Sequence, residues 1–128
     1  NPYLFLSTET VRYKSVAAAD QALGEVKASY AACVQNKGGT ERDGLFTKYE
    51  FLELPNLPSN LVSTNQRVVV HAKIGEGEAT RYLLGAYQYH KDMFTGLYVV
   101  RSGEKDFSQE ELSRWLNVAG VMAERLKS

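Results

Sequence analysis

The chain lacks the features that mark several specialised classes of protein. Its single cysteine, Cys33, has no partner for an internal disulfide, and no cysteines and histidines have zinc-site spacing. Lysine plus arginine and aspartate plus glutamate both number 15, so the formal net charge is zero. A neutral chain exerts no long-range attraction on a phosphate backbone or an anionic membrane. We therefore expect no nucleic-acid partner, no metal and no cofactor.

Long apolar runs are also missing. Stretches such as Val68-Val69-Val70 and Tyr82-Leu83-Leu84 are interrupted within a few residues, whereas a membrane span needs about 20 apolar residues in succession. Asn1-Pro2 opens the sequence without an initiator methionine, a basic segment or an apolar segment, so we expect a mature or trimmed chain. Its ordinary globular composition and length of 128 residues predict a single domain over residues 1–128.

Apolar residues recur with helical spacing in the first third of the chain. They are Ala19, Leu23, Val26, Tyr30 and Cys33, separated by four, three, four and three positions. Ser15 can cap the first turn, and Lys37-Gly38-Gly39 provides a flexible stop. The pattern predicts a helix at about 16–36, on whose apolar face Cys33 would pack as an unreactive small side chain.

A second helix is predicted from Ser108 to the end of the chain. Ser108-Gln109-Glu110-Glu111 has the form of a capping box, and Phe107 and Leu112 can form the accompanying hydrophobic staple. An apolar stripe then follows, formed by Leu112, Trp115, Leu116, Ala119, Met122, Ala123 and Leu126. A stripe of this kind is expected to pack on a flat surface.

The segments between the helices have the alternating pattern of strands. We expect strands at 45–54, 67–74, 81–90 and 97–101, and before the first helix at 11–14 with another at 3–6. The resulting fold class is α+β. It comprises an antiparallel sheet of about four to five strands, with an N-terminal and a C-terminal helix packed on one face.

No group of residues has the pattern of a catalytic site. His71 and His90 are the only histidines, and each lies on an expected strand without a second ligand nearby, which favours a structural or surface role. Glu110-Glu111 is explained by helix capping, and Gly75-x-Gly77 lacks the residues of a phosphate loop. We therefore expect a protein that is not an enzyme and has no catalytic residues.

The aromatic residues are the feature of the sequence that most favours a binding function. The candidate binding residues are Tyr82, Tyr87, Tyr89, Phe94 and Tyr98. They occupy both faces of the expected hairpin, so one set would point away from a single layer of helices and could line a cleft or a protein interface. The alternative is that these rings form cross-strand pairs that only stabilise the sheet.

Segments near both ends of the chain form a recognisable set. They are Val11-Arg12-Tyr13-Lys14-Ser15 running into Ala17-Ala18-Ala19, Ala31-Ala32-Cys33, Leu97-Tyr98-Val99-Val100-Arg101, Phe107-Ser108 and Met122-Ala123-Glu124-Arg125-Leu126. This set resembles small actinobacterial extracytoplasmic domains, a group that includes lipoprotein domains and receptor-kinase sensor domains. The resemblance implies a non-enzymatic, membrane-anchored domain outside the cytoplasm, tethered through a segment beyond these residues.

Three functions remain open from the sequence. The first is an extracytoplasmic domain that binds a small ligand or acts as a sensor, in contact with the membrane only through its tether. The second is a protein-interaction module without a small ligand, and the third is a small cone-shaped α+β enzyme. A cytoplasmic location remains the alternative. An enclosed cavity would favour ligand binding or catalysis, and a flat apolar patch would favour a protein partner.

Overall fold

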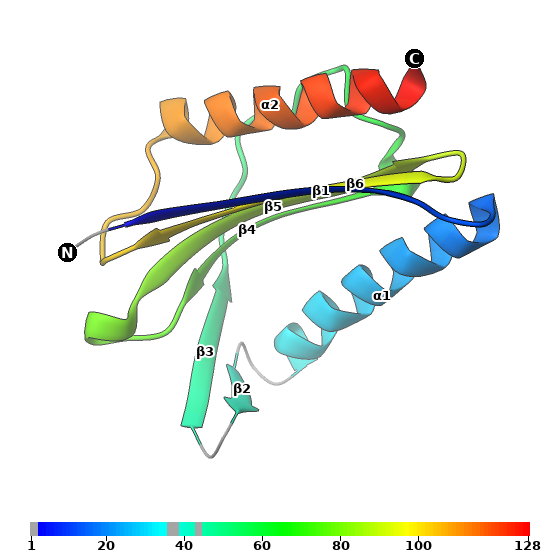
Figure 1. Ribbon diagram of the computed structural model, residues 1–128. Helices are drawn as coiled ribbons and strands as arrows, with labels where there is room; N and C mark the ends of the chain where they lie inside the picture. The colour runs from blue at the N-terminus through cyan, green and yellow to red at the C-terminus, as the bar shows by residue number, and fades with distance from the viewer. Residues whose placement is uncertain (1–2, 36–38, 43–44) are drawn as a thin grey trace.

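The structure, a computed structural model, describes residues 3–35, 39–42 and 45–128, and the side chains of these residues outside the range 33–48. Its elements in chain order are β1 (Leu4–Arg12), α1 (Val16–Gln35), β2 (Gly39–Arg42), β3 (Leu45–Phe51), β4 (Arg67–Ile74), β5 (Arg81–His90), β6 (Met93–Ser102) and α2 (Gln109–Lys127). Figure 1 shows their arrangement.

The strands form an antiparallel sheet in the order β1-β6-β5-β4-β3-β2. Five of them, from β1 to β3 in this order, make a continuous sheet, which the short strand β2 extends beside β3. The first strand of the chain therefore lies at an edge, paired along its whole length with the last strand. The expected α+β fold, with an antiparallel sheet, an N-terminal helix and a C-terminal helix, is confirmed.

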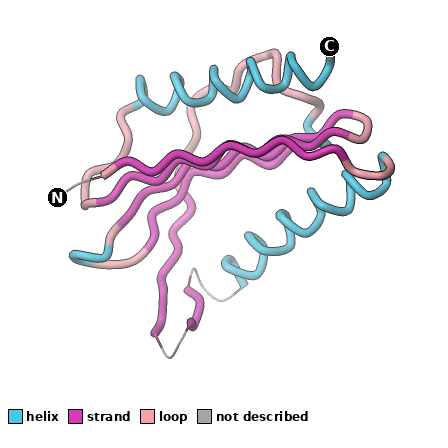
Figure 2. Tube along the Cα trace, in the orientation of Figure 1, coloured by secondary structure: helices cyan, strands magenta, loops and turns pink. Residues whose placement is uncertain are grey.

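The two helices cover opposite faces of the sheet, as Figures 1 and 2 show. Helix α2 packs on a core that includes Leu84 and Leu97, whereas α1 packs on Tyr89 and Phe94, which have the opposite parity on the same strands. The expectation that both helices share one face is wrong. The physical reason is that β5 is apolar on both parities, so a single layer of helices would leave one of its faces uncovered.

The strands also differ from expectation at three places. A single strand, β1, replaces the two short strands expected at 3–6 and 11–14, and β2 was not expected. Strand β6 begins at Met93, so only Lys91 and Asp92 connect it to β5. Lys91 adopts a φ of 54°, and this left-handed conformation permits so tight a turn without a glycine.

Helix α2 begins as the sequence predicts. The Glu111 backbone amide donates to Ser108 Oγ at 3.1 Å, and the Ser108 amide donates to Glu111 Oε1 at 2.9 Å, which completes the capping box. Phe107 and Leu112 are both buried in the core beneath the helix. Trp115 is only partly buried, at the flank of the apolar stripe.

Helix α1 contacts the sheet through few buried side chains. The Ala18 amide donates to Ser15 Oγ at 3.0 Å, so Ser15 caps the first turn. Of its described side chains, only Ala19 and Leu23 are buried. Cys33 belongs to this helix, but its side chain is outside the described part. Within the described residues, neither helix is sufficiently long and apolar to cross a bilayer.

Candidate ligand-binding cleft

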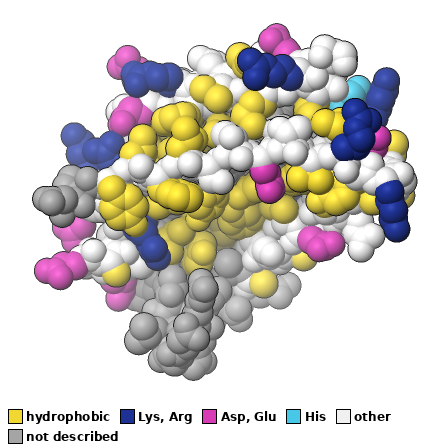
Figure 3. Space-filling model, viewed as in Figure 1, with side chains coloured by type: hydrophobic (Ala, Val, Ile, Leu, Met, Phe, Trp, Pro, Cys, Tyr) yellow, Lys and Arg dark blue, Asp and Glu magenta, His cyan; other side chains and the backbone are white. Residues whose placement is uncertain are grey.

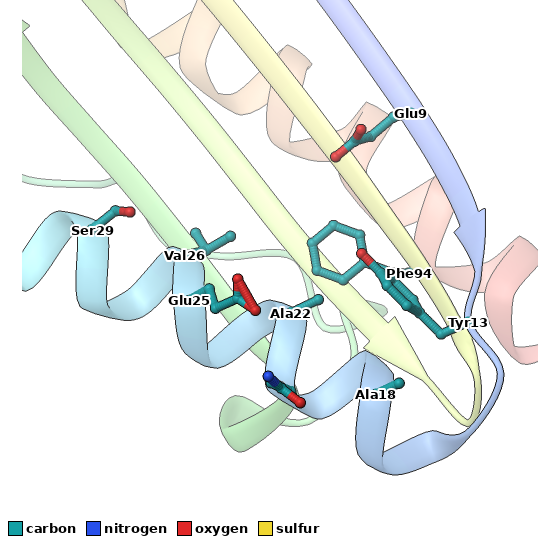
Figure 4. A pocket seen from close by; sticks show the side chains of 9 residues that line it. Glu9, Tyr13, Ala18, Ala22, Glu25, Val26, Ser29 and Phe94 are labelled. Carbon is teal, nitrogen blue, oxygen red and sulfur yellow. The ribbon is translucent and has the colours of Figure 1, made fainter.

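Few side chains of α1 are buried against the sheet, and a cleft of about 460 Å³ lies between this helix and the β1–β6 side of the sheet. Figure 4 shows it from close by. Its lining residues are Glu9, Tyr13, Ala18, Gln21, Ala22, Glu25, Val26, Ser29 and Phe94. Phe94 forms part of the wall and meets the ring of Tyr13 edge to face, with the ring centroids 6.1 Å apart.

A second, smaller hollow of about 220 Å³ adjoins the cleft on the same face of the sheet. It is lined by Phe5, Ser7, Glu9, Tyr87, Gly96 and Tyr98. Glu9 lines both spaces and so marks the place where they meet. Figure 3 shows hydrophobic side chains gathered in the recess on this side of the molecule. Together the two spaces form one surface that runs from α1 to the edge strand.

Two glycines, Gly96 in the lining of the smaller hollow and Gly85 on β5, leave room for the Tyr87 ring. Gly96 is the cross-strand partner of Tyr87, and the Tyr87 ring lies 3.2 Å from the position that a Cβ at Gly96 would occupy. At Gly85 the corresponding distance to the Tyr87 ring is 3.0 Å. A side chain at either position would therefore displace this ring, because both distances are tighter than ordinary van der Waals contact.

Tyr87, which lines the smaller hollow, belongs to a group of neighbouring aromatic rings. Tyr30 of α1 lies 6.4 Å from Tyr87 and 6.2 Å from Phe51, measured between ring centroids. Burial raises the pKa of Tyr30, and the hydrogen bond with Tyr87 adds to this effect. Burial also raises the pKa of Tyr87 and of Tyr98. These phenols therefore stay neutral at ordinary pH, and those of Tyr87 and Tyr98 are hydrogen-bonding groups in the lining of the smaller hollow.

The charged groups on the surface are all carboxylates. Glu9 projects from β1 and Glu25 from α1 at the opposite wall (Figure 4), and none of the lysine, arginine or histidine side chains that the structure describes lines the cleft. Neither carboxylate has an ion pair or a side-chain hydrogen bond within the described part of the chain. The cleft therefore combines aromatic walls with a negative potential that favours a cation.

The structure separates the five aromatic residues that the sequence singled out. Tyr87, Phe94 and Tyr98 lie on the face of the sheet that α1 covers and line the two hollows. Tyr82 lies on the other face, in the core beneath α2, where its hydroxyl donates to the Glu104 carbonyl at 3.3 Å. Tyr89 is buried beneath α1. The argument that one layer of helices leaves a whole set of rings exposed therefore fails.

The position of Tyr89 is fixed by a polar contact. Its hydroxyl donates to Asp20 Oδ1 at 2.7 Å, and this hydrogen bond is the main reason why the pKa of Tyr89 is raised. Because Asp20 belongs to the second turn of α1, the bond anchors the start of the helix on β5. Tyr89 thus holds one wall of the cleft in place and does not line it.

Sequence reasoning missed the residues that β1 and α1 contribute. Glu9 and Glu25 have no recognisable local pattern, since each is an exposed carboxylate on an ordinary strand or helix. The signal that was present lies in Gly85 and Gly96, two glycines inside strands rich in aromatic residues. Glycine in a strand interior often marks a close approach of a ring or a ligand.

The histidines lie away from the cleft. The His71 ring is buried on the face that α2 covers, where its Nδ1 donates to the Glu53 carbonyl at 2.6 Å and its Nε2 lies 2.9 Å from Asp106 Oδ1. His90 ends β5, beside the turn to β6. Within the described residues, no three histidine, cysteine, aspartate or glutamate side chains come together as a metal site.

The described residues thus bring together an aromatic surface with two carboxylates, built from β1, α1, β5 and β6. Compared with known proteins, the chain matches no family model and no curated protein sequence.

Proposed function

We propose that this protein is a non-enzymatic binding domain and that its ligand is a small molecule with an apolar or aromatic body and a positive charge. The observation that carries the proposal is the cleft between α1 and the sheet, whose volume of about 460 Å³ falls in the range of small-ligand sites. The adjoining hollow lined by Tyr87 and Tyr98 provides room for a longer ligand.

The chemistry of the walls supports this class of ligand. Rings such as Phe94 and Tyr98 contribute apolar contact and can interact with a cation through their faces. Glu9 and Glu25 lie on opposite walls, so a cationic group between them would be attracted from both sides. A negatively charged ligand would instead be repelled by both carboxylates.

We further propose that the domain acts outside the cytoplasm as a sensor-like module tethered to a membrane. The support is the resemblance of the opening strand and helix, and of the last strand and helix, to extracytoplasmic lipoprotein and receptor-kinase sensor domains. An open cleft on a compact scaffold agrees with such a role, since a ligand can enter it without a large rearrangement.

The experiment uses benzamidine and benzoate, two probes with the same ring and opposite charge. Amide shifts of the ¹⁵N-labelled protein are recorded during titration with each. We expect benzamidine to shift the amides around Glu9, Ala22 and Phe94 in a saturable way, and benzoate to leave them unchanged. The double variant Glu9→Gln/Glu25→Gln should lose most of the response, whereas Glu104→Gln/Glu124→Gln, which alters two exposed carboxylates outside the cleft, should keep it.

Three outcomes would contradict the proposal. Equal shifts with both probes would show that the carboxylates do not select the ligand. Shifts that cluster on the loop at 55–60 and spare the cleft would place a binding surface elsewhere. An absence of saturable shifts with either probe would leave the surface without small-ligand binding, as expected of a protein-interaction module.

A further inference from the structure

The edge strand β1 exposes an unusual run of large apolar side chains. Tyr3, Leu4, Phe5 and Leu6 are consecutive, and each is between 49% and 53% exposed. Figure 3 shows hydrophobic side chains on both sides of the strand. Natural edge strands are normally protected by lysine, proline, a bulge or a covering segment. The described part of β1 has none of these between Leu4 and Thr8.

Among the described strands, none pairs with the outer side of β1, which is the edge of the sheet. The Ser102 amide donates to the Tyr3 carbonyl and the Tyr13 amide to the Asp92 carbonyl, so the odd-numbered residues of β1 form the hydrogen-bonded pairs with β6. The amides and carbonyls of Leu4, Leu6 and Thr8 therefore point away from the sheet. They form a regular row to which another antiparallel strand can be added.

We propose that β1 pairs with β1 of a second copy, antiparallel about a two-fold axis at Leu6, so that the two sheets become one. In this register Leu6 faces Leu6 of the second copy, and Leu4 faces Thr8 of the second copy. The apolar residues of both strands then cover one another at the centre of an isologous interface.

A second copy of this chain fits the edge better than an unrelated strand, because the run is complementary to itself. No charged residue occurs from Tyr3 to Thr8, so the two-fold pairing places no like charges opposite each other. The first charged residue, Glu9, would face Tyr3 of the second copy, whose phenol can donate to a carboxylate.

The charged residues of β1, Glu9 and Arg12, determine where the two-fold axis lies. An axis at Thr8 would use more of β1, but it would set the two Glu9 side chains diagonally across one face, roughly 7–8 Å apart. It would also leave Leu4 facing Arg12. An axis at Leu6 avoids the repulsion and sets Leu6 opposite Leu6 of the second copy, so we assign the axis to Leu6.

The dimer would complete the smaller hollow. Phe5, Ser7 and Glu9 line it from β1, the edge strand of the sheet. In the proposed register, Phe5 of the second copy stands beside Ser7 on the same face of the joined sheet. The second copy would thus supply an outer wall for the hollow, although the proposal does not depend on ligand binding.

The test is sedimentation velocity on the purified chain and three variants. We expect the wild type to sediment at twice the 14.3 kDa mass of one chain. Leu6→Lys places a charge at the axis, and Thr8→Pro removes an outward amide while leaving the bonds to β6 intact, so both should be monomeric. Val121→Lys, at a residue of α2 that is 46% exposed, is the matched control and should remain a dimer.

Hydrogen exchange on the same samples reports the register. In the wild-type dimer the amides of Leu4, Leu6 and Thr8 should exchange slowly, and in Leu6→Lys they should exchange quickly while the odd-numbered amides stay protected. A monomeric wild type would overturn the proposal. The proposal would also be overturned if both edge variants were dimers, or if Leu4, Leu6 and Thr8 exchanged quickly in a wild-type dimer. In either case the interface would lie elsewhere.

Discussion

At the scale of single residues, the buried imidazole of His71 connects three segments that are distant in sequence. It extends from β4 to the Glu53 carbonyl after β3 and to the Asp106 side chain before α2. Asp106 Oδ1 also accepts from the Phe107 amide at 2.7 Å, next to the residue that caps the helix. One side chain thus fixes where α2 begins relative to the sheet.

We predict that His71→Ala lowers the free energy of unfolding by about 2 to 3 kcal/mol, because it leaves a cavity and removes hydrogen bonds from partly buried acceptors. Urea titration followed by circular dichroism measures the change. His90→Ala, at the end of the β5–β6 hairpin, serves as the control and should cost less than half as much. Equal losses in the two variants would show that the contacts of His71 contribute little.

At the scale of elements, the start of α2 depends on a charged capping box. The hydrogen bond from the Ser108 amide holds the pKa of Glu111 below its usual value, and Arg101 contributes further, with Nη1 at 3.1 Å from Glu111 Oε2. A lowered pKa means that the ionised carboxylate stabilises the folded state. This contribution is present above the ordinary glutamate pKa near 4.5 and is lost as the pH falls through the lowered folded value.

We predict that Glu111→Gln costs about 1 kcal/mol at neutral pH, since a partly exposed cap contributes about that much. The difference from the wild type should shrink under acid conditions, where the Glu111 carboxyl is protonated. Urea titrations at neutral pH and at a pH below the lowered value measure both effects. Glu110→Gln is the matched control, because Glu110 is 85% exposed and its ion pair is with the exposed Arg114 one turn further along the helix. If the difference in the free energy of unfolding between Glu111→Gln and the wild type grew in acid, it would contradict the prediction that the ionised carboxylate stabilises the folded state.

At the scale of the whole molecule, the tyrosines of the α1 face link folding to alkaline pH. Burial raises the pKa of Tyr30, Tyr87 and Tyr98, and the bond to Asp20 raises that of Tyr89. The folded protein therefore holds these protons more tightly than the unfolded chain does. Their contribution to stability is complete below the ordinary tyrosine pKa of 10.0 and is lost as the pH rises through the higher folded values.

We predict that Tyr30, Tyr87, Tyr89 and Tyr98 do not ionise in alkaline solution while the fold is intact, because their raised pKa values keep these protons bound until the chain unfolds. Tyrosinate absorbance and far-ultraviolet circular dichroism, recorded on the same samples, test this. Tyr30→Phe should move the unfolding transition to higher pH, because it removes a group that must ionise. Ionisation of all eight tyrosines in one step, with the fold intact, would refute the prediction.

Local signals in the sequence determined both helices and most of the strands. The sequence predicts helix α1 at 16–36, and the helix spans Val16–Gln35. Four residues beginning at Ser108 predict the capping box, which is present. These signals are reliable because caps and periodicity act between residues that are close in the chain. They also predicted the α+β class, since alternating strands between two amphipathic helices have few other ways to bury their apolar faces.

Only the tertiary structure decided which face of the sheet each helix covers and where the cleft lies. Tyr82 and Tyr87 look alike in the sequence, yet their opposite parity on β5 places Tyr82 beneath α2 and Tyr87 in the smaller hollow on the other face. The cleft itself joins Glu9 of β1 to Phe94 of β6 and Glu25 of α1. Their juxtaposition depends on pairing between the first and last strands, a contact across most of the chain that no local pattern encodes.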